Sequence, residues 1–100
     1  MKCERAVQKV LGGDREAFRE VIREHGPGIR AFLAGFLSDP HAVDDCAQET
    51  FISAYENLAR FDAEKPLNFW LKGIARNTVM AHLRGEYRRG AAMKKLQIRV

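Results

Sequence analysis

Hydrophobic positions in the first 37 residues recur with the three-to-four-residue spacing of α-helices. The spacing predicts a short leading helix over residues 7–11, which the pair Gly12-Gly13 ends. Asp14 predicts the cap of a second helix, whose apolar stripe ends near Gly26-Pro27-Gly28. A further helix is predicted over residues 29–37.

The second half of the chain predicts two longer helices. Asp39 followed by Pro40 is a typical helix start, and that helix is predicted to run to about Ala59. Residues 60–66 interrupt the pattern, and the last helix is predicted to begin near Pro66. The sequence contains no strand-like alternation and no internal repeat, so we expect an all-α, compact bundle of four to five helices.

The helix predicted from Pro40 to Ala59 has two well-separated faces. Its apolar face consists of Val43, Cys46, Ala47, Thr50, Phe51, Ala54 and Leu58. The opposite face, which we name the acidic stripe, consists of Asp45, Gln48, Glu49, Ile52 and Glu56. One interpretation of this stripe is a solvated surface. The other is a protein-binding face, where carboxylates attract a basic partner and the isoleucine adds apolar contact.

The last predicted helix is apolar on one side and basic-aromatic on the other. Its predicted inward side consists of Leu67, Trp70, Leu71, Ile74, Thr78 and Ala81. Its other side consists of Phe69, Lys72, Arg76, Met80, Leu83, Arg84 and Tyr87, with Asn77 at the boundary. Cations interleaved with aromatic rings suit single-stranded nucleic acid, because cations meet phosphates and rings stack on unpaired bases. The alternative is a central helix that is buried on both sides.

The charge distribution is polarised along the chain, although the net charge of the 100 residues is only +4. Residues 1–59 carry 7 Lys and Arg against 10 Asp and Glu, whereas residues 60–100 carry 10 against 3. Such a chain can offer a polyanion its basic end and keep an acidic surface for a second partner. The alternative is that the basic residues of 60–100 form a solvated surface without a partner, which would give the same numbers of charged residues.

Several function classes are disfavoured by what the sequence lacks. No apolar run has the length of a membrane span or a signal peptide, so we expect a cytoplasmic protein without membrane partners. Cys3 and Cys46 do not have the spacing of a metal site or a disulfide framework, so we expect both cysteines to be reduced. His25, His41 and His82 have no partner at metal or triad spacing, and no glycine-rich phosphate loop is present. We therefore expect no catalytic residue, no metal, no cofactor and no enzymatic activity.

Three segments of the sequence resemble one bacterial family. Residues 39–55 (DPHAVDDCAQETFISAY), residues 68–77 (NFWLKGIARN) with His82-Leu83-Arg84, and residues 13–18 (GDREAF) are similar to stretches of the extracytoplasmic-function (ECF) sigma factors of the sigma-70 class. The resemblance covers about residues 10–90 in the family's order. It implies that residues 1–90 form the helical domain called region 2, and that residues 91–100 are a basic tail or the start of an interdomain linker.

The resemblance implies a role in transcription initiation and two sets of contacts. The family binds the clamp helices of the largest subunit of core RNA polymerase. The residues that match this contact are Asp44, Asp45, Gln48 and Glu49. The acidic stripe adds Ile52 as a further candidate for the same contact. The family also recognises and melts the promoter minus-ten element, using a loop that captures a base flipped from the non-template strand. Here that loop is about Phe61 to Asn68, and the candidate DNA contacts are Phe61, Lys65, Asn68, Lys72, Arg76, Asn77, Arg84, Arg88 and Arg89. An anti-sigma factor is a further expected partner.

The sequence also departs from the family pattern. Ala81 stands where the family usually carries an aspartate, and the loop is short and contains Pro66, so the family's base preference does not transfer. The minus-thirty-five-reading domain of such factors has no counterpart in these residues, which leaves both a piece of a longer factor and a solitary domain open. A different hypothesis is a helical protein-interaction module without a DNA role, for example a decoy for an anti-sigma factor.

Overall fold

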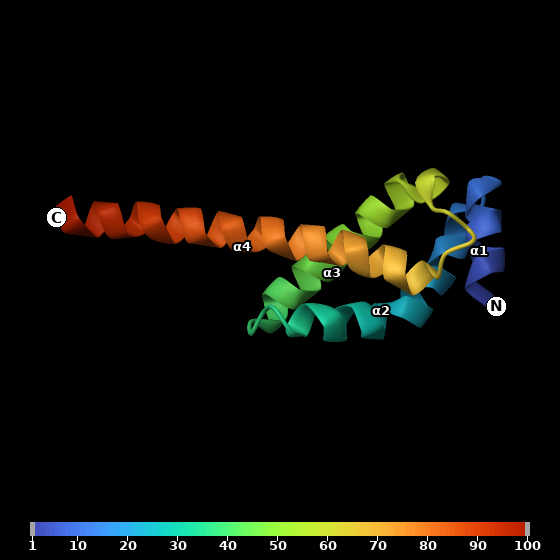
Figure 1. Ribbon diagram of the computed structural model, residues 1–100, viewed down its shortest axis with the longest axis horizontal. Helices are drawn as coiled ribbons and strands as arrows, with labels where there is room; N and C mark the ends of the chain where they lie inside the picture. Colours follow the sequence, from blue (N-terminus) through green and yellow to red (C-terminus); the bar gives the residue numbers. More distant parts are fainter. Residues whose placement is uncertain (1, 100) are drawn as a thin grey trace.

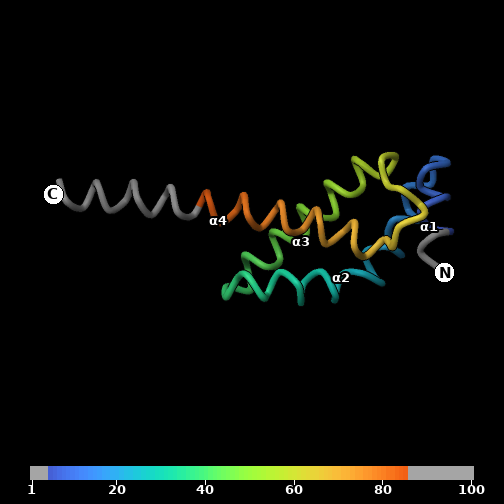
Figure 2. Tube along the Cα trace, in the orientation of Figure 1, coloured from blue at the N-terminus to red at the C-terminus, as the bar shows by residue number. Residues whose placement is uncertain are grey.

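The computed structural model describes the backbone of residues 2–99 and the side chains of residues 5–85, and Figure 2 shows the latter range in colour. Over this range the chain forms four α-helices and two short 3-10 helices. In chain order they are α1 (Lys2–Leu11), η1 (Arg15–Ala17), α2 (Phe18–Ala34), α3 (Pro40–Glu56), η2 (Leu58–Arg60) and α4 (Leu67–Arg99). Residues 2–99 contain no strand, and the predicted all-α bundle is confirmed.

The helices pack around α3, which contacts both α2 and α4, while α1 packs across the start of α2 (Figure 1). The segment between η2 and α4 returns the chain past α1, so α4 begins at that end of the bundle (Figure 1). The turn between α2 and α3 lies at the opposite end. The α2–α3 turn and the segment between η2 and α4 therefore lie at opposite ends of the bundle.

The core consists of one side of each helix. Its fully buried large side chains are Val21, Leu33, Cys46, Thr50, Leu71 and Val79. The apolar face predicted for α3 is confirmed, with Val43 half-buried and the other six residues buried. Thr50 is tolerated there because its Oγ1 donates a 2.7 Å hydrogen bond to the carbonyl of Cys46, which satisfies the hydroxyl inside the helix.

Helix α2 contradicts the prediction of a helix end near Gly26-Pro27-Gly28, because it continues through that segment to Ala34. The continuous helix places Val21, Ile29 and Leu33 on one buried face. Gly26 is buried on the same side, whereas Pro27 is exposed, so water can reach the Arg23 carbonyl that loses its helical partner. The gain from aligning the apolar residues outweighs the proline's cost.

The other predicted boundaries are closer to the structure. Helix α1 ends at Leu11, and Gly13 takes a φ of +109°, which favours glycine. Asp14 precedes η1 rather than an α-helix, and its side chain makes no capping bond. Asp39 is confirmed as the cap of α3, since its Oδ1 accepts a 3.0 Å bond from the backbone N–H of His41. Helix α3 ends at Glu56, earlier than predicted.

Candidate protein and nucleic-acid interfaces

The acidic stripe lies on the outer surface of α3. All five of its side chains are exposed, and Ile52 in its middle has 57% of its surface accessible. The separation of this stripe from the buried face of the same helix agrees with the predicted pattern. An exposed isoleucine between carboxylates gives the stripe both a charge and an apolar contact point.

Asp44 lies at the margin of the stripe. Its carboxylate forms an ion pair with Arg30 of α2 and is about half accessible. The contact joins α2 to α3, and the guanidinium offsets the negative charge that Asp44 would otherwise present. Asp44 therefore contributes less to the field of the stripe than Asp45 or Glu49 does.

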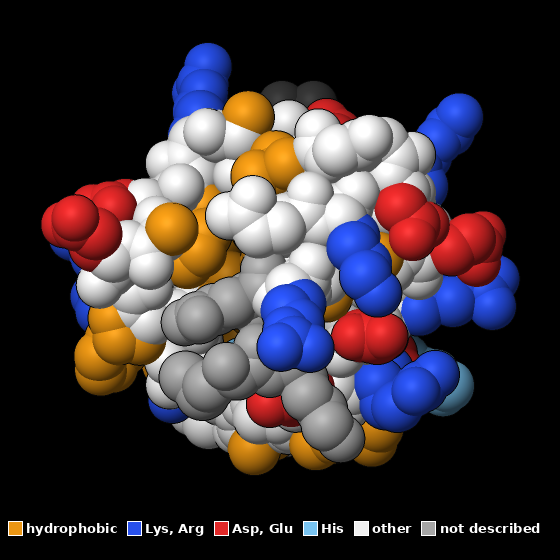
Figure 3. All heavy atoms as spheres, turned by 90° about the vertical axis from the view of Figure 1, so that its right-hand side faces the viewer, with side chains coloured by type: hydrophobic (Ala, Val, Ile, Leu, Met, Phe, Trp, Pro, Cys, Tyr) orange, Lys and Arg blue, Asp and Glu red, His pale blue; other side chains and the backbone are white. Residues whose placement is uncertain are grey.

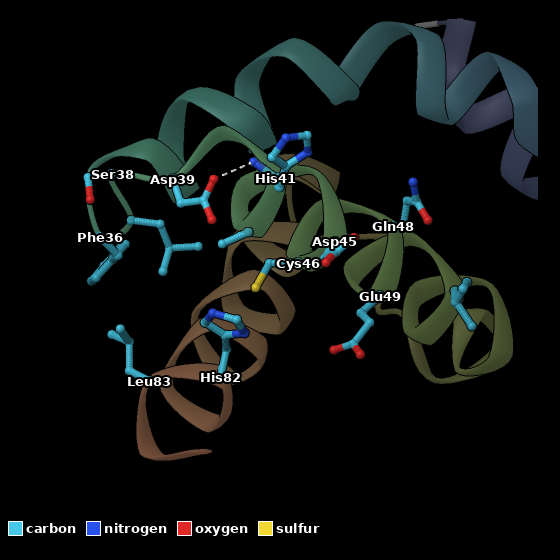
Figure 4. Close-up of a pocket in the computed structure, with 13 residues that line it drawn as sticks. Phe36, Ser38, Asp39, His41, Asp45, Cys46, Gln48, Glu49, His82 and Leu83 are labelled. Carbon is cyan, nitrogen blue, oxygen red and sulfur yellow. Dashed lines mark hydrogen bonds between the residues drawn. The ribbon is translucent and has the colours of Figure 1, made fainter. Parts of the chain in front are cut away.

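An acid-lined hollow of about 770 Å³ adjoins the stripe at the α2–α3 turn. Figure 4 shows Asp45 and Glu49 of α3 on one side of it, with His82 and Leu83 of α4 across from them. Phe36, which is 39% exposed, closes the end of the hollow. The hollow thus combines carboxylates with apolar walls, which suits the long aliphatic stem and charged head of a lysine or arginine.

Cys46 forms part of the floor of this hollow, where its side chain points from α3 toward His82 (Figure 4). Burial raises the pKa of the Cys46 thiol, and the neighbouring carboxylates of Glu49 and Asp45 raise this pKa further. The thiol is therefore held in its neutral, weakly nucleophilic form, as is typical of a cysteine that packs in a core.

A second, apolar groove of about 580 Å³ lies on the other side of the stripe, between α2 and α3. Its lining includes Phe18, Ile22, Phe51, Ile52 and Tyr55. Phe18 contacts the rings of Phe51 and Tyr55 edge-on, with centroids 6.5 and 5.4 Å away. Sequence reasoning missed this groove because Ile22, which is 42% exposed, follows the same spacing as the core positions of α2.

Helix α4 is turned relative to the predicted register. Leu71, Ala75 and Val79 are fully buried, although the prediction included only the first of them. Ala81, predicted to face inward, is exposed. The remaining predicted inward residues, Leu67, Trp70, Ile74 and Thr78, are half-buried. The alternative of a helix buried on both sides is wrong, because the opposite side is open to solvent and carries a Phe69 ring that is 66% exposed.

The structure places most of the predicted DNA contacts on the outer side of α4 and in the loop before it. Lys65, Asn68, Arg76, Asn77 and Arg84 are exposed, and Phe61 and Lys72 are half-buried. The Phe61 ring packs against Trp70, with centroids 5.2 Å apart and planes inclined at 45°. Arg88 and Arg89 lie outside the residues whose side chains are described.

An aromatic pocket of about 450 Å³ lies between the loop and the start of α4. Its lining consists of Phe61, Asp62, Lys65, Pro66, Phe69 and Trp70. Two of these residues, Phe61 and Lys65, are among the predicted DNA contacts, and Asp62 and Pro66 belong to the loop that was predicted to hold a base. Phe69 was expected on the basic-aromatic side of the helix, but sequence reasoning did not place Trp70 at a binding surface.

The loop that forms one wall of this pocket is an ordered turn. The Asp62 Oδ1 accepts a 3.0 Å bond from the backbone N–H of Glu64, and the N–H of Lys65 donates to the Asp62 carbonyl at 3.0 Å. Figure 3, which looks onto the end of the molecule with α1, shows basic, acidic and hydrophobic side chains interspersed there. Uniform positive charge thus does not dominate this end, and any nucleic-acid contact here has to depend on particular side chains.

The described residues offer neither a metal site nor a membrane-spanning helix. Among the described residues, no group of three or more His, Cys, Asp or Glu side chains is arranged to hold a metal ion. Within the same residues, no helix combines the length and the apolar character needed to cross a membrane.

Comparisons with known proteins identify the family of the chain. Residues 21–89 match the family described as Sigma-70 region 2. The chain is 31% identical over 84 residues to the ECF RNA polymerase sigma factor SigW of Bacillus subtilis, a match that covers 84% of this chain and 45% of the relative. It is 35% identical over 83 residues to the RNA polymerase sigma-H factor of Pseudomonas aeruginosa, covering 83% and 43%. The chain thus spans less than half the length of these relatives.

A solved structure has the same fold. The NMR structure of an engineered region 2 of sigmaE in complex with GTAAAA matches with a TM-score of 0.78 and 31% sequence identity. The match covers 84% of this chain and 87% of that one. The family match spans more than half of the chain, and the matched relatives are sigma factors. The chain therefore belongs to the Sigma-70 region 2 family, with ECF sigma factors among its relatives.

Proposed function

We propose that this domain acts in transcription initiation by binding core RNA polymerase through α3 and single-stranded minus-ten DNA through the start of α4. The observation that carries the proposal is the aromatic pocket at the start of α4. It occurs in a fold that matches a region 2 solved in complex with the oligonucleotide GTAAAA. The domain would then work in the cytoplasm, where bacterial polymerase is found.

The polymerase contact is proposed for the acidic stripe and the two hollows beside it. Carboxylates of Asp45 and Glu49 attract a basic surface, and Ile52 lies between the acid-lined hollow and the apolar groove and lines both. A helix that carries basic side chains beside an apolar edge fits this combination. The clamp helices of the largest polymerase subunit are the proposed partner, and an anti-sigma factor would compete for the same surface.

The DNA contact is proposed for the aromatic pocket and the exposed side of α4. Phe69 offers a ring on which an unpaired base can stack, while Lys65 and Arg76 are exposed cations that can meet phosphates. Stacking on the pocket can offset the few kcal/mol that an unpaired base costs.

The acid-lined hollow and the aromatic pocket share no lining residue. The acid-lined hollow lies at the α2–α3 turn, and the aromatic pocket lies at the end of the bundle where α4 begins (Figure 1). Polymerase and the non-template strand can therefore be bound at the same time, as transcription initiation requires.

The polymerase contact is tested by charge reversal on the stripe. In a pull-down with bacterial core RNA polymerase, the parent should be retained and the double variant Asp45→Arg, Glu49→Arg should be lost, with unchanged thermal unfolding because both side chains are exposed. Glu20→Arg, an equally exposed position on α2, serves as the control and should bind as the parent does. Retention of the double variant would show that the stripe is not the contact.

The DNA contact is tested separately, by fluorescence anisotropy with labelled single-stranded oligonucleotides. Binding that depends on base sequence supports the minus-ten role. A chain that is retained by polymerase but binds no single strand would instead favour the protein-interaction module without a DNA role.

A further inference from the structure

We propose that the outer face of α2 and α3 binds a second copy of this chain, in a symmetric dimer that covers the surface proposed for polymerase. The dimer is independent of the proposed function, and only its competition with polymerase rests on that function. We name this outer face, which consists of the apolar groove and a further hollow beside it, the hairpin face.

The hairpin face is a continuous surface formed by two helices. The further hollow, of about 480 Å³, lies near the α2–α3 turn, and Arg30 belongs both to its lining and to that of the apolar groove. Every residue of the two linings belongs to α2, α3 or the turn between them. Ile22 and Ile52 are 42% and 57% exposed on this face. An apolar surface of this kind, bordered by charged residues, is typical of a protein contact.

The two edges of the hairpin face carry opposite charges. The basic edge consists of Arg23 and Arg30 of α2, which line the hollows and are exposed. The acidic edge consists of Asp45 and Glu49 of α3, which are exposed on the acidic stripe beside Ile52. A surface with one edge of each sign is complementary to itself, because a second copy related by a twofold axis presents each edge to the opposite one.

The charged residues lie at matching levels along the two helices. Arg30 forms an ion pair with Asp44, so these two residues lie at the same level. Helices α2 and α3 run in opposite directions from a short turn (Figure 1). Arg23, seven residues before Arg30, therefore lies near the level of Phe51, and both residues line the apolar groove.

A twofold axis along the groove brings the two edges together. Such an axis keeps each residue at its level and places α2 of the second copy over α3. Arg30 of the second copy then lies one residue from the level of Asp45, and Arg23 lies two residues from the level of Glu49. These offsets are about 1.5 and 3 Å along the helix axis, which a long arginine side chain can span. Because the axis is twofold, each pair forms twice.

The dimer covers part of the surface proposed for polymerase. Ile52 lines both the apolar groove and the acid-lined hollow, so the second copy and polymerase would contact the same side chain. Asp45 and Glu49 would likewise be engaged by the arginines of the second copy. The two contacts are therefore mutually exclusive, and polymerase has to displace the second copy.

The test compares the chain with its Arg23→Glu and Glu49→Arg variants by sedimentation equilibrium between about 1 μM and 1 mM. Both positions are exposed, so both variants should fold as the parent does, which circular dichroism checks. Each variant turns two attractive pairs into repulsive pairs, so its dimer dissociation constant should rise by about tenfold or more. Arg19→Glu makes the same charge change on α2 outside both linings, and this matched control should dimerise as the parent does.

An equimolar mixture of the two variants separates the proposed pairing from a general effect of charge. In a mixed dimer, the new glutamate faces the new arginine on one side of the axis. On the other side, the original Arg23 faces the original Glu49. All pairs are attractive again, so the mixture should dimerise with a dissociation constant within about threefold of the parent's.

A parent that stays monomeric up to about 1 mM would overturn the proposal, as would a dimer that neither variant weakens or a mixture that stays monomeric. In the pull-down with core RNA polymerase, Arg23→Glu should be retained at least as strongly as the parent, because its stripe is not covered. Loss of its retention would assign the basic edge to polymerase and overturn the competition. A parent that dimerises but is not retained by polymerase would overturn the proposed function and leave the dimer in place.

Discussion

The exposed ring of Phe69 allows the DNA contact to be separated from the stability of the fold. Full burial of a phenylalanine side chain contributes about 1.5–3 kcal/mol. Phe69 is 66% exposed, so only about a third of that contribution is present in the free domain, or roughly 0.5–1 kcal/mol. Alanine is also the better helix former, which offsets part of the loss. We therefore expect Phe69→Ala to lower the free energy of unfolding by less than about 1 kcal/mol.

The same substitution should have a larger effect on DNA affinity. Stacking of one base on an aromatic side chain is worth about 1–3 kcal/mol, which corresponds to roughly a 5- to 150-fold increase in Kd when the ring is removed. Urea unfolding followed by circular dichroism gives the stability, and fluorescence anisotropy with a labelled single strand gives the Kd. Both are measured on the same preparation of the chain.

Phe36→Ala provides the control for this pair of measurements. Phe36 is also a partly exposed phenylalanine, but it lies in the acid-lined hollow. Its removal should leave the Kd for DNA unchanged. If Phe69→Ala bound DNA as tightly as the parent, the assignment of this ring to base stacking would be refuted. A loss of more than about 2 kcal/mol of stability would instead contradict the small contribution of this ring to the fold.

Three further predictions address the charge, the core and the thiol. Arg76→Ala should reduce the slope of log K against log salt by about 1, whereas Arg19→Ala, at an exposed ion pair on α2, should leave this slope unchanged. Leu71→Ala should lower the free energy of unfolding by about 2–5 kcal/mol in urea titrations, because its side chain is fully buried and leaves a cavity. The Cys46 pKa is raised in the folded state, so the unfolded chain loses the thiol proton first, and the parent's stability should fall relative to Cys46→Ala as the pH rises above about 8.5. A stability difference between the parent and this variant that stays constant from pH 7 to 10 would contradict the raised pKa.

Helix α3 could be predicted well because its determinants are local. The cap at Asp39 and the proline after it mark the start of the helix. The 3.6-residue helical period of the apolar positions then separates the buried face from the acidic stripe. The stripe was therefore placed from the sequence alone, although its two adjoining hollows were not. Those hollows depend on α2 and α4, whose distance from α3 is set by packing rather than by the pattern of α3.

The register of α4 could not be predicted because both flanks of its buried side carry apolar residues. Leu67, Trp70 and Ile74 lie on one flank, and Ala75 and Val79 extend the other. The flank that becomes fully buried depends on where α2 and α3 cross α4. These contacts join residues that are far apart in the sequence, so the pattern of α4 alone does not determine them. The aromatic pocket was not predicted for the same reason. Only its loop could be located, since Phe69 and Trp70 line the pocket from the first turn of α4.

Helix α2 was divided in two because Gly-Pro-Gly is a strong local signal for a helix end. The spacing of the apolar residues on both sides of this segment instead indicates one continuous helix. Phe18, Val21, Ile29 and Leu33 keep one helical face across the interruption, and a break would have removed some of them from the core. The interruption is tolerated because Pro27 is exposed and lies on the solvent side of the helix.

The continuity of α2 therefore predicts that Pro27→Ala stabilises the domain. In a helix interior, proline is about 3 kcal/mol less favourable than alanine, and the greater entropy of the unfolded alanine chain offsets roughly 0.4–1 kcal/mol of this. We expect a gain of about 2 kcal/mol, or on the order of 10 °C in Tm, measured by calorimetry. Pro66→Ala, at a proline outside the helices, should give no such gain. If two helices met at residues 26–28, Pro27 would favour the second helix start, and Pro27→Ala would be neutral or destabilising.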